Sequence, residues 1–310
     1  MNSTIARVDG RLPLQLTGLR GMLVDYYELT KPRIILLLLV TTAASMVMAA
    51  RGLPPLGILV ATLVAGALAA GSSGAFNCAI DRDIDPLMRR TMMRPIPLGR
   101  VTPRQAIVFA TVTGIVSFAL FYLCVNPFAA WLSLGGELYY VVIYSLWLKR
   151  VTTANIVIGG ASGAIPALVG WAAVTNSIGW PALGLFALVF FWTPPHFWSL
   201  ALMVETDYHK ANIPMLPNVY GVRRTTVEIL AYTAILVAGS LALTFLGVFG
   251  AWYFAAAAVL GGIFLYKAYM IFAGPSKQRA RSTFRYSLLY LALMSAAMVI
   301  DRLVAVIPRH

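Results

Sequence analysis

Three aspartates stand within five residues of one another in the segment FNCAIDRDIDPLMRRTMMRP, residues 76–95. Residues four apart on an α-helix are offset by about 40°, so Asn77, Asp81 and Asp85 are predicted to share one face, with Asp83 on the other side. An amide and two carboxylates form an oxygen-only cluster, which suits Mg²⁺ bound together with substrate phosphates. Pro86 disfavours α-helical geometry at Asp85, so the helix is predicted to end or kink there.

A structural interpretation of the same cluster is that the aspartates only cap the helix and pair with nearby arginines. Carboxylates at a helix C-terminus oppose the helix dipole, however, and this favours a bound cation over simple capping. Guanidinium groups bind phosphate through two parallel hydrogen bonds, so the arginines that follow are predicted to clamp a phosphate group. The candidates in this segment are Arg82, Arg89 and Arg94.

A second acidic cluster occurs in FWTPPHFWSLALMVETDYHKANIPMLP, residues 191–217. His196 and Asp207 are eleven residues apart, which is about three helical turns. A continuing helix would place them on nearly the same face, with Glu205 on the opposite one. We therefore interpret His196 and Asp207 as catalytic candidates, Asp207 also as a partner for the first cluster, and Lys210 as a further phosphate-binding candidate.

His196 and Asp207 also allow a purely structural interpretation. His196 can be a hydrogen-bonded polar residue inside a helical bundle, and Asp207 can be a surface acid paired with Lys210. Pro194 and Pro195 precede the histidine, and they predict a broken helix of the kind that lines a cavity at membrane depth.

A third segment, YSLWLKRVTTANIVIGGASGAIPALVGW, covers residues 144–171. Lys149 and Arg150 are predicted to contact phosphate or carboxylate groups, although Arg150 can equally be a topology signal. Glu137 lies inside the preceding apolar stretch, and acids in such positions are functional candidates. The sequence does not identify its partner.

The composition shows which elements must position these groups. The 310 residues are 60% hydrophobic and 11% charged, with a mean hydropathy of +0.80, whereas soluble domains carry roughly a quarter charged residues. Stretches of about 20 apolar residues, each long enough to cross a bilayer as a helix, recur along the chain. We predict an all-α polytopic membrane protein with nine spans, at approximately 34–50, 56–76, 105–125, 127–147, 155–174, 180–203, 226–247, 250–272 and 286–305.

The net charge of +13 is not spread evenly. Twenty of the 24 Lys and Arg fall before the first predicted span or in alternate loops, which places these loops and the N-terminus in the cytoplasm and the C-terminus outside. This pattern favours a membrane partner and no nucleic acid. We expect a cytoplasmic segment at 1–33, one membrane-embedded domain at 34–305 and a short external tail at 306–310.

The three segments, in their order along the chain, resemble signatures of the UbiA superfamily of intramembrane prenyltransferases, and within it the protohaem IX farnesyltransferase branch. The resemblance implies a helical bundle around a central cavity, Mg²⁺ as cofactor, and farnesyl diphosphate and haem B as substrates. It implies that the farnesyl group is transferred to the 2-vinyl group of haem B to give haem O, with a downstream haem O oxidase as a further partner. It assigns the Mg²⁺–diphosphate role to Asn77, Asp81 and Asp85, with Asp207 across the cavity.

Two departures from the wider superfamily are visible. A second D-x3-D motif is absent, and Glu137 stands where an uncharged residue is expected. Two other function classes stay open at this point: a quinone- or lipid-type prenyltransferase, which shares the first acidic cluster, and a transporter, which lacks support from paired half-repeats. A bacterial inner membrane is the expected location.

Overall fold

The computed structural model describes residues 18–306, and these residues form helices with no strand among them. The helices are α1 (Gly18–Leu29), α2 (Pro32–Ala50), α3 (Leu56–Ile80), η1 (Asp81–Asp83), η2 (Asp85–Leu87), α4 (Pro103–Cys124), α5 (Pro127–Leu138), η3 (Tyr139–Leu148), α6 (Lys149–Val151), α7 (Asn155–Thr175), α8 (Trp180–Met203), α9 (Glu205–Lys210), α10 (Leu216–Phe245), α11 (Ala251–Ala273) and α12 (Lys277–Val306). The all-α prediction is confirmed. The predicted tail at 306–310 and the first 17 residues of the N-terminal segment lie almost entirely outside the described residues.

Eight of the described helices are long and apolar enough to cross a membrane. They correspond to eight of the nine predicted spans. The remaining stretch, 127–147, is occupied by α5, with 12 residues, followed directly by the π-helix η3, with 10 residues. Neither part alone has the length of a span, so the count of nine stays a prediction.

Local signals explain where several helices begin. Thr102 and Gln105 form a reciprocal capping box at the start of α4, which satisfies backbone amides that have no partner inside the helix. Asn126 accepts a hydrogen bond from the Ala129 amide at the start of α5. A proline occupies the first turn of both helices, where its missing N–H costs nothing.

Three helices differ from the sequence-based expectation. α1 was not predicted, and it exposes Leu19, Leu23 and Tyr27, which are 69%, 60% and 62% exposed. α10 and α12 begin about ten residues earlier than expected, because charged side chains interrupt the apolar run in their first ten residues and the prediction followed apolar length alone. α10 also contains a non-helical residue, Gly221, with φ 79°, a conformation that glycine adopts without a Cβ clash.

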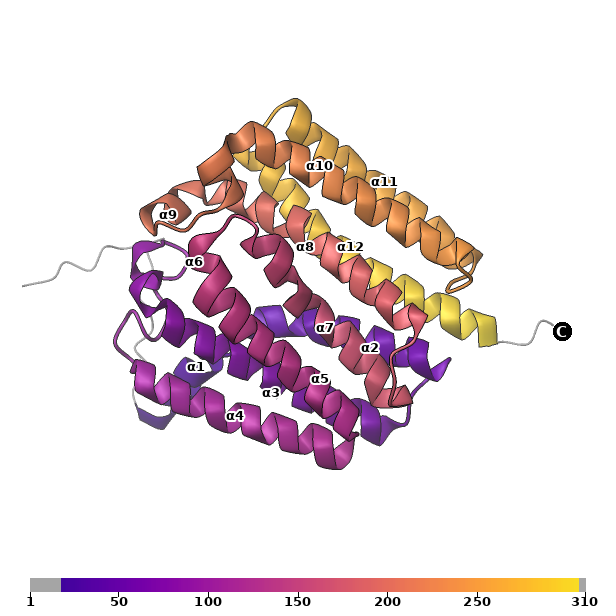
Figure 1. Cartoon of the computed structure of the whole chain (residues 1–310), viewed down its shortest axis with the longest axis horizontal. Coiled ribbons are helices and arrows are strands. Elements are labelled where there is room, and N and C mark those ends of the chain that lie inside the picture. The colour runs from indigo at the N-terminus through magenta and orange to yellow at the C-terminus, as the bar shows by residue number, and fades with distance from the viewer. Residues whose placement is uncertain (1–17, 307–310) are drawn as a thin grey trace, which may run out of the picture.

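The helices pack side by side as a bundle, with α7 and α8 between two outer groups (Figure 1). α3 and α4 pack along each other on one side, and α10 and α11 do so on the other. α7 contacts α2, α5 and α8, and α8 contacts α10 and α12. The predicted central cavity remains an expectation.

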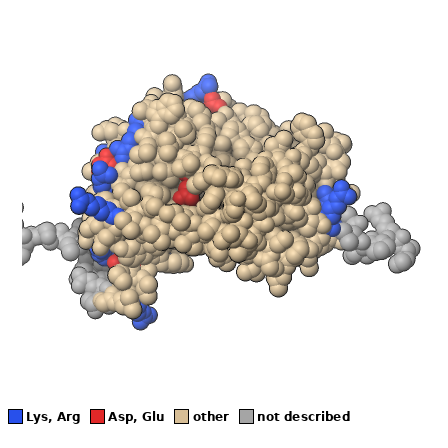
Figure 2. Space-filling model, turned by 60° about the horizontal axis from the view of Figure 1, so that its bottom comes forward, with Lys and Arg blue, Asp and Glu red and all other residues tan. Residues whose placement is uncertain are grey.

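The charged side chains mark the two ends of this bundle. Figure 2 shows Lys and Arg gathered at one end of the molecule and a smaller group at the other, with an almost uncharged body between them. One acidic group is recessed within that body. This pattern agrees with a membrane-embedded body.

Candidate functional site

The helix that carries the first acidic cluster ends earlier than predicted. α3 stops at Ile80, and the chain continues as two 3₁₀ turns, η1 and η2. The expectation of one α-helical face through Asn77, Asp81 and Asp85 is therefore wrong. Aspartate is a weak helix former and is disfavoured at a helix C-terminus, which accounts for the early end. All three side chains are nevertheless buried, at 4%, 1% and 0% exposed. The Lys31 ammonium, which contacts Asn77, also lies within the field of the Asp81 and Asp85 carboxylates.

Asn77 is held by two neighbours from other elements. Its Nδ2 donates to the Ser145 hydroxyl at 3.1 Å, and its Oδ1 accepts a hydrogen bond from the Lys31 ammonium. Lys31 adopts a left-handed conformation (φ 58°) directly before Pro32. Gly74 makes this approach possible, because a Cβ there would lie 2.9 Å from the Thr30 carbonyl oxygen. The sequence analysis treated Lys31 only as a topology signal and missed it as a site residue.

The two buried aspartates each have a cationic partner. Lys149 forms an ion pair with Asp81, and Arg94 Nη1 lies 3.0 and 2.8 Å from the two Asp85 oxygens. Thr91 donates to the Asp85 carbonyl at 2.9 Å and so fixes the loop. Arg94 and Lys149 were both predicted to bind phosphate. The structure places them beside the buried aspartates, and their binding of phosphate stays a prediction.

The environment changes the acidity of these cations. Burial lowers the pKa of Lys31 and of Lys149, because a charged ammonium loses hydration there. For Arg94, burial works in the same direction, but nearby negative groups, Asp85 foremost, together outweigh it and the pKa is raised. At all three cations the carboxylates of the motif oppose the effect of burial.

The other predicted phosphate-binding residues lie away from this core. Arg150 forms two hydrogen bonds to Asp83, at 2.7 and 2.8 Å, on the exposed side of η1. Arg82 donates to the Ala79 carbonyl at 3.2 Å. Arg89 and Lys210 are exposed and form no ion pair within residues 18–304. Their role in binding phosphate stays a prediction.

His196 lies in an aromatic cluster between α8 and α12. Its ring stacks on Trp192 and Phe284, with centroids 4.4 and 4.7 Å away, and its Nδ1 lies 2.7 Å from the Ser287 hydroxyl. α8 continues through Pro194 and Pro195, so the predicted break at these prolines is wrong.

The geometric argument that joined His196 to Asp207 also fails. α8 ends at Met203, and Asp207 belongs to the separate helix α9, with the non-helical Val204 between them (ψ 29°). Asp207 is 7% exposed. Among residues 18–304 it has no ion pair with Lys210, contrary to the surface-pair alternative.

Packing connects the two acidic segments. Ile84 and Met88, on either side of Asp85, share a buried cluster with Tyr208 and Ile213. Asp207 precedes Tyr208, so α9 lies against the loop that carries the first motif. The structure brings these segments together without a direct contact between their carboxylates in the described part of the chain.

The chemistry of the donor set fits a metal that is completed by its substrate. Asp81 Oδ1 is buried and, among the described residues, has no hydrogen-bond partner, which leaves one carboxylate oxygen free to bind a metal. Within the described residues, no three His, Cys, Asp or Glu side chains lie close enough to hold a metal ion by themselves. Mg²⁺ typically takes one or two carboxylates plus phosphate oxygens, so this donor set suits Mg²⁺ bound with a diphosphate.

Comparison with known proteins identifies the family. The UbiA prenyltransferase family matches residues 38–294. The chain belongs to this family. Proteins named protoheme IX farnesyltransferase are similar to it over most of their length: that of Gloeobacter violaceus is 53% identical, with 91% of this chain and 93% of that protein covered. That of Paenarthrobacter aurescens is 46% identical, with 97% of each covered. The resemblance found in the three sequence segments is confirmed.

Solved structures of the UbiA family share the fold at low sequence identity. A digeranylgeranylglyceryl phosphate synthase superposes with a TM-score of 0.75 at 17% identity, covering 91% of this chain and 98% of the other. A UbiA homologue from Archaeoglobus fulgidus, described as bound to DMAPP and Mg²⁺, superposes with a TM-score of 0.64 at 17% identity, covering 88% and 99%. The chain therefore has the UbiA fold, as the sequence segments predicted.

The UbiA prenyltransferase chain also contains an acid that the sequence analysis left without a partner. Glu137 in α5 is 9% exposed and contacts the Ser72 hydroxyl in α3. Gly114 in α4 makes room for both, since a Cβ there would lie 3.0 Å from Ser72 Oγ and 3.1 Å from Glu137 Oε1. Ser72 Oγ also lies 2.7 Å from the Ala110 carbonyl. Glu137 thus joins three helices.

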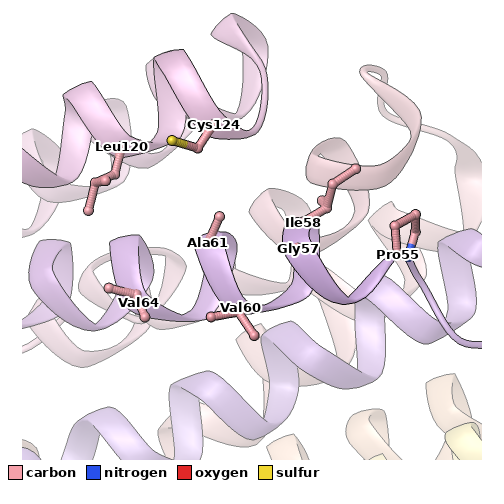
Figure 3. A pocket seen from close by; sticks show the side chains of 8 residues that line it. All are labelled: Pro55, Gly57, Ile58, Val60, Ala61, Val64, Leu120 and Cys124. Atoms are coloured by element: carbon pink, nitrogen blue, oxygen red, sulfur yellow. The ribbon is translucent and has the colours of Figure 1, made fainter.

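Two apolar grooves lie on the outside of this UbiA bundle. One, of about 650 Å³, lies between α3 and α4 and is lined by Pro55, Gly57, Ile58, Val60, Ala61, Val64, Leu120 and Cys124 (Figure 3). It holds no charged group and is remote from the acidic motif. The other, of about 370 Å³, is lined by Thr30 and Pro32, on either side of Lys31, and extends along α2 and α3 to Leu39 and Ala67. Only the second groove adjoins the candidate site.

Proposed function

We propose that this chain transfers the farnesyl group of farnesyl diphosphate to haem B and forms haem O. The similarity to proteins named protoheme IX farnesyltransferase, at 53% identity over 285 residues, carries this assignment. The buried acidic motif and its cations support it, because this chemistry requires a site that binds and neutralises a diphosphate. A UbiA homologue described as bound to GPP and Mg²⁺ shares the fold.

The diphosphate is bound at the end of α3. Asn77, Asp81 and Asp85 would hold Mg²⁺, with Asp207 approaching from α9, and the metal would neutralise charge that develops on the diphosphate oxygens. Lys149 and Arg94 already lie beside these aspartates. When a diphosphate enters, their donors can turn from carboxylate to phosphate oxygens without leaving the site. Arg82, Arg89, Arg150 and Lys210 complete the basic rim.

Group transfer then forms two bonds at the vinyl group, one to farnesyl C1 and one to the oxygen of water, while the allylic C–O bond, the vinyl π bond and one O–H bond of water break. The bond between farnesyl C1 and the diphosphate oxygen breaks, and the electron pair leaves with the diphosphate. The 2-vinyl group of haem B supplies the electrons for the new carbon–carbon bond, and water adds to the vinyl carbon that becomes cationic, giving the hydroxyethylfarnesyl group after loss of a proton. Donors aimed at the leaving oxygens stabilise the negative charge that develops there in the transition state. Stabilisation of the transition state is what accelerates the reaction.

His196 is proposed to act on the acceptor side. Its aromatic neighbours Trp192 and Phe284 provide flat apolar surfaces suited to a macrocycle or to an allylic cation. The groove beside Lys31 is apolar along α2 and α3, and it suits a prenyl chain whose diphosphate lies at the acidic motif.

The setting follows from the same proposal. Both substrates are lipid-soluble, so the enzyme takes them from the bilayer, with the acidic motif on the cytoplasmic side and the C-terminus outside a bacterial inner membrane. Haem O is useful to the cell as an oxidase cofactor or as its precursor, so a haem O-consuming oxidase is the expected downstream partner.

The test is a reconstituted reaction. Purified protein in nanodiscs, given haem B, labelled farnesyl diphosphate and Mg²⁺, is expected to form labelled haem O, and Asp85→Asn is the matched control. Transfer of label to a phenolic acceptor, with none to haem B, would replace the proposal with the quinone-type alternative. Membership in a prenyltransferase family argues against the transporter alternative, and retention of label on farnesyl diphosphate in every reaction would contradict the proposal.

A further inference from the structure

Two helix ends meet in matched register at the acidic motif. Ser145 in η3 and Lys149, the first residue of α6, are four residues apart. They contact Asn77 in α3 and Asp81, the first residue of η1, which are also four residues apart. η3 is a π-helix of ten residues. π-Helical turns are rare and frequently occur at functional sites. Lys149 is already part of the proposed diphosphate site, whereas nothing so far assigns a role to Ser145.

Hydrogen-bond accounting fixes the direction of the bond between Ser145 and Asn77. A serine hydroxyl has one proton and two acceptor lone pairs. Ser145 Oγ donates that proton to the Tyr140 carbonyl at 3.0 Å, five residues back along the π-helix. It can therefore only accept from Asn77, so Nδ2 of the amide must face Ser145 at 3.1 Å.

The other face of the amide gives the same orientation independently. Lys31 carries donors only, and it contacts Asn77 on Oδ1. Oδ1 therefore points to the side where the cations and carboxylates of the motif converge. If the Asn77 amide were flipped, its oxygen would face the Ser145 oxygen, which has no proton left to donate. Its NH₂ donors would then face the Lys31 ammonium, which also only donates.

We infer that Ser145 is a positioning residue that keeps the Asn77 carboxamide with Oδ1 toward the Mg²⁺–diphosphate site. This inference rests on the proposed use of Asn77 as a metal ligand. Lys31 cannot perform this task once the site is filled, because it holds the oxygen that the metal needs. Ser145 holds the amide from behind through Nδ2 and leaves Oδ1 free, so its effect persists in the loaded state.

The energetic basis is the burial of both partners. Asn77 is 4% exposed and Ser145 is fully buried, so an amide donor that loses Ser145 finds no water in its place. Hydrogen bonds behind a metal ligand typically contribute 10- to 100-fold to metal affinity or activity. The loss is expected in Mg²⁺-dependent binding of the diphosphate.

The experiment measures binding and requires no acceptor. Protein in nanodiscs is titrated with Mg²⁺ in the presence of labelled farnesyl thiolodiphosphate, an analogue that resists ionisation, and bound label is counted. Ser145→Ala is expected to raise the Mg²⁺ concentration for half-maximal binding about 10-fold or more. Ser145→Thr keeps the hydroxyl and is expected to restore the wild-type value. Ser117→Ala is the matched control, because this buried serine donates to the Ala65 carbonyl at 2.7 Å, away from the motif.

A second background separates orientation from packing. A carboxylate presents an oxygen in either orientation, so Ser145→Ala is expected to have no further effect on Mg²⁺ dependence when it is added to Asn77→Asp. An unchanged Mg²⁺ dependence in Ser145→Ala, or an equal loss in the Asn77→Asp background, would overturn the inference.

The two proposals fail in different ways. Normal Mg²⁺-dependent binding without formation of haem O would overturn the haem acceptor alone and leave the role of Ser145 intact. Absence of any Mg²⁺ dependence in the wild-type protein would overturn the role of Ser145 together with the metal site.

Discussion

Lys149 and Asp81 form an ion pair in which the lysine side chain is 9% exposed and the aspartate side chain 1% exposed. The pair joins Lys149, the first residue of α6, to Asp81, which directly follows α3. Buried ion pairs contribute little net stability, but removal of one partner leaves an uncompensated charge and costs about 3–5 kcal/mol. The same pair is therefore a structural link in the empty protein and a source of phosphate-binding charge in the loaded one.

A double-variant cycle separates these two roles. Lys149→Met and Asp81→Asn are each expected to lower the unfolding temperature, because each leaves one buried charge or donor without its partner. The combined variant is expected to unfold at a higher temperature than Lys149→Met but to form almost no haem O. Thermal unfolding in detergent and product formation check this. Recovery of turnover in the combined variant would show that neither charge is needed for catalysis.

The three aspartates of the first motif are expected to differ in importance. Asp81→Ala and Asp85→Ala remove buried carboxylates of the proposed metal site and should each lower the rate by about 100-fold or more. Asp83→Ala removes an exposed pair with Arg150, which costs at most about 1 kcal/mol, so its rate should stay within several-fold of wild type. Rates at saturating Mg²⁺ measure the difference. The ranking is wrong if Asp83→Ala is the most damaging of the three.

Asp207→Asn tests the second acidic segment. The amide keeps the size of the side chain and removes its charge, so transition-state stabilisation is expected to fall by about 3 kcal/mol, on the order of 100-fold in rate. Haem B binding uses the acceptor side and should persist, as measured by the haem absorption of the purified variant. Near-normal turnover would leave Asp207 with a structural role only.

Metal and diphosphate are expected to bind cooperatively. Lys31, Arg94 and Lys149 face the motif, while Asp81 and Asp85 supply two negative charges. These five groups carry one excess positive charge, and Asp207 would bring the set to neutrality, so a bare divalent cation gains no net attraction. Mn²⁺ used as an electron-spin probe should therefore bind at least about 10-fold more tightly with farnesyl thiolodiphosphate than without it, within the usual range of coupling between two ligands. Equal affinities in the two conditions would contradict this charge balance.

Accessibility to an impermeant thiol reagent tests the topology. In a variant with Cys78 and Cys124 replaced by serine, Leu98→Cys and Ser276→Cys are expected to react only from the cytoplasmic side. Leu53→Cys, in the connection between α2 and α3, provides the opposite control, since Leu53 is 79% exposed. Reaction of Leu98→Cys from outside would invert the proposed orientation.

The sequence predicted well those features that depend on apolar length and on residue type. Eight spans follow from runs of apolar residues, because a backbone in lipid must satisfy its own hydrogen bonds. Asn77, Asp81 and Asp85 are all buried, and their joint use as a metal site stays a prediction.

Features that depend on local backbone breaks or on register between helices could not be predicted in the same way. The face argument assumed that α-helical geometry continues to Asp85 and from His196 to Asp207, and both helices end first. The π-helical turn that brings Ser145 to Asn77 has no sequence signature. Lys31 was missed because its contact with Asn77 depends on a left-handed turn and on the close approach at Gly74.

Asp301, near the end of α12, has a consequence for how the chain can be shortened or tagged. Its carboxylate accepts hydrogen bonds from the amides of Gly250 and Tyr253, at 2.8 and 3.2 Å, and so caps the start of α11. That helix remains uncapped during synthesis until the last membrane segment has been inserted. A deletion that removes Asp301 should therefore damage a helix that begins fifty residues upstream, whereas a reporter fused after Val306 leaves this cap in place.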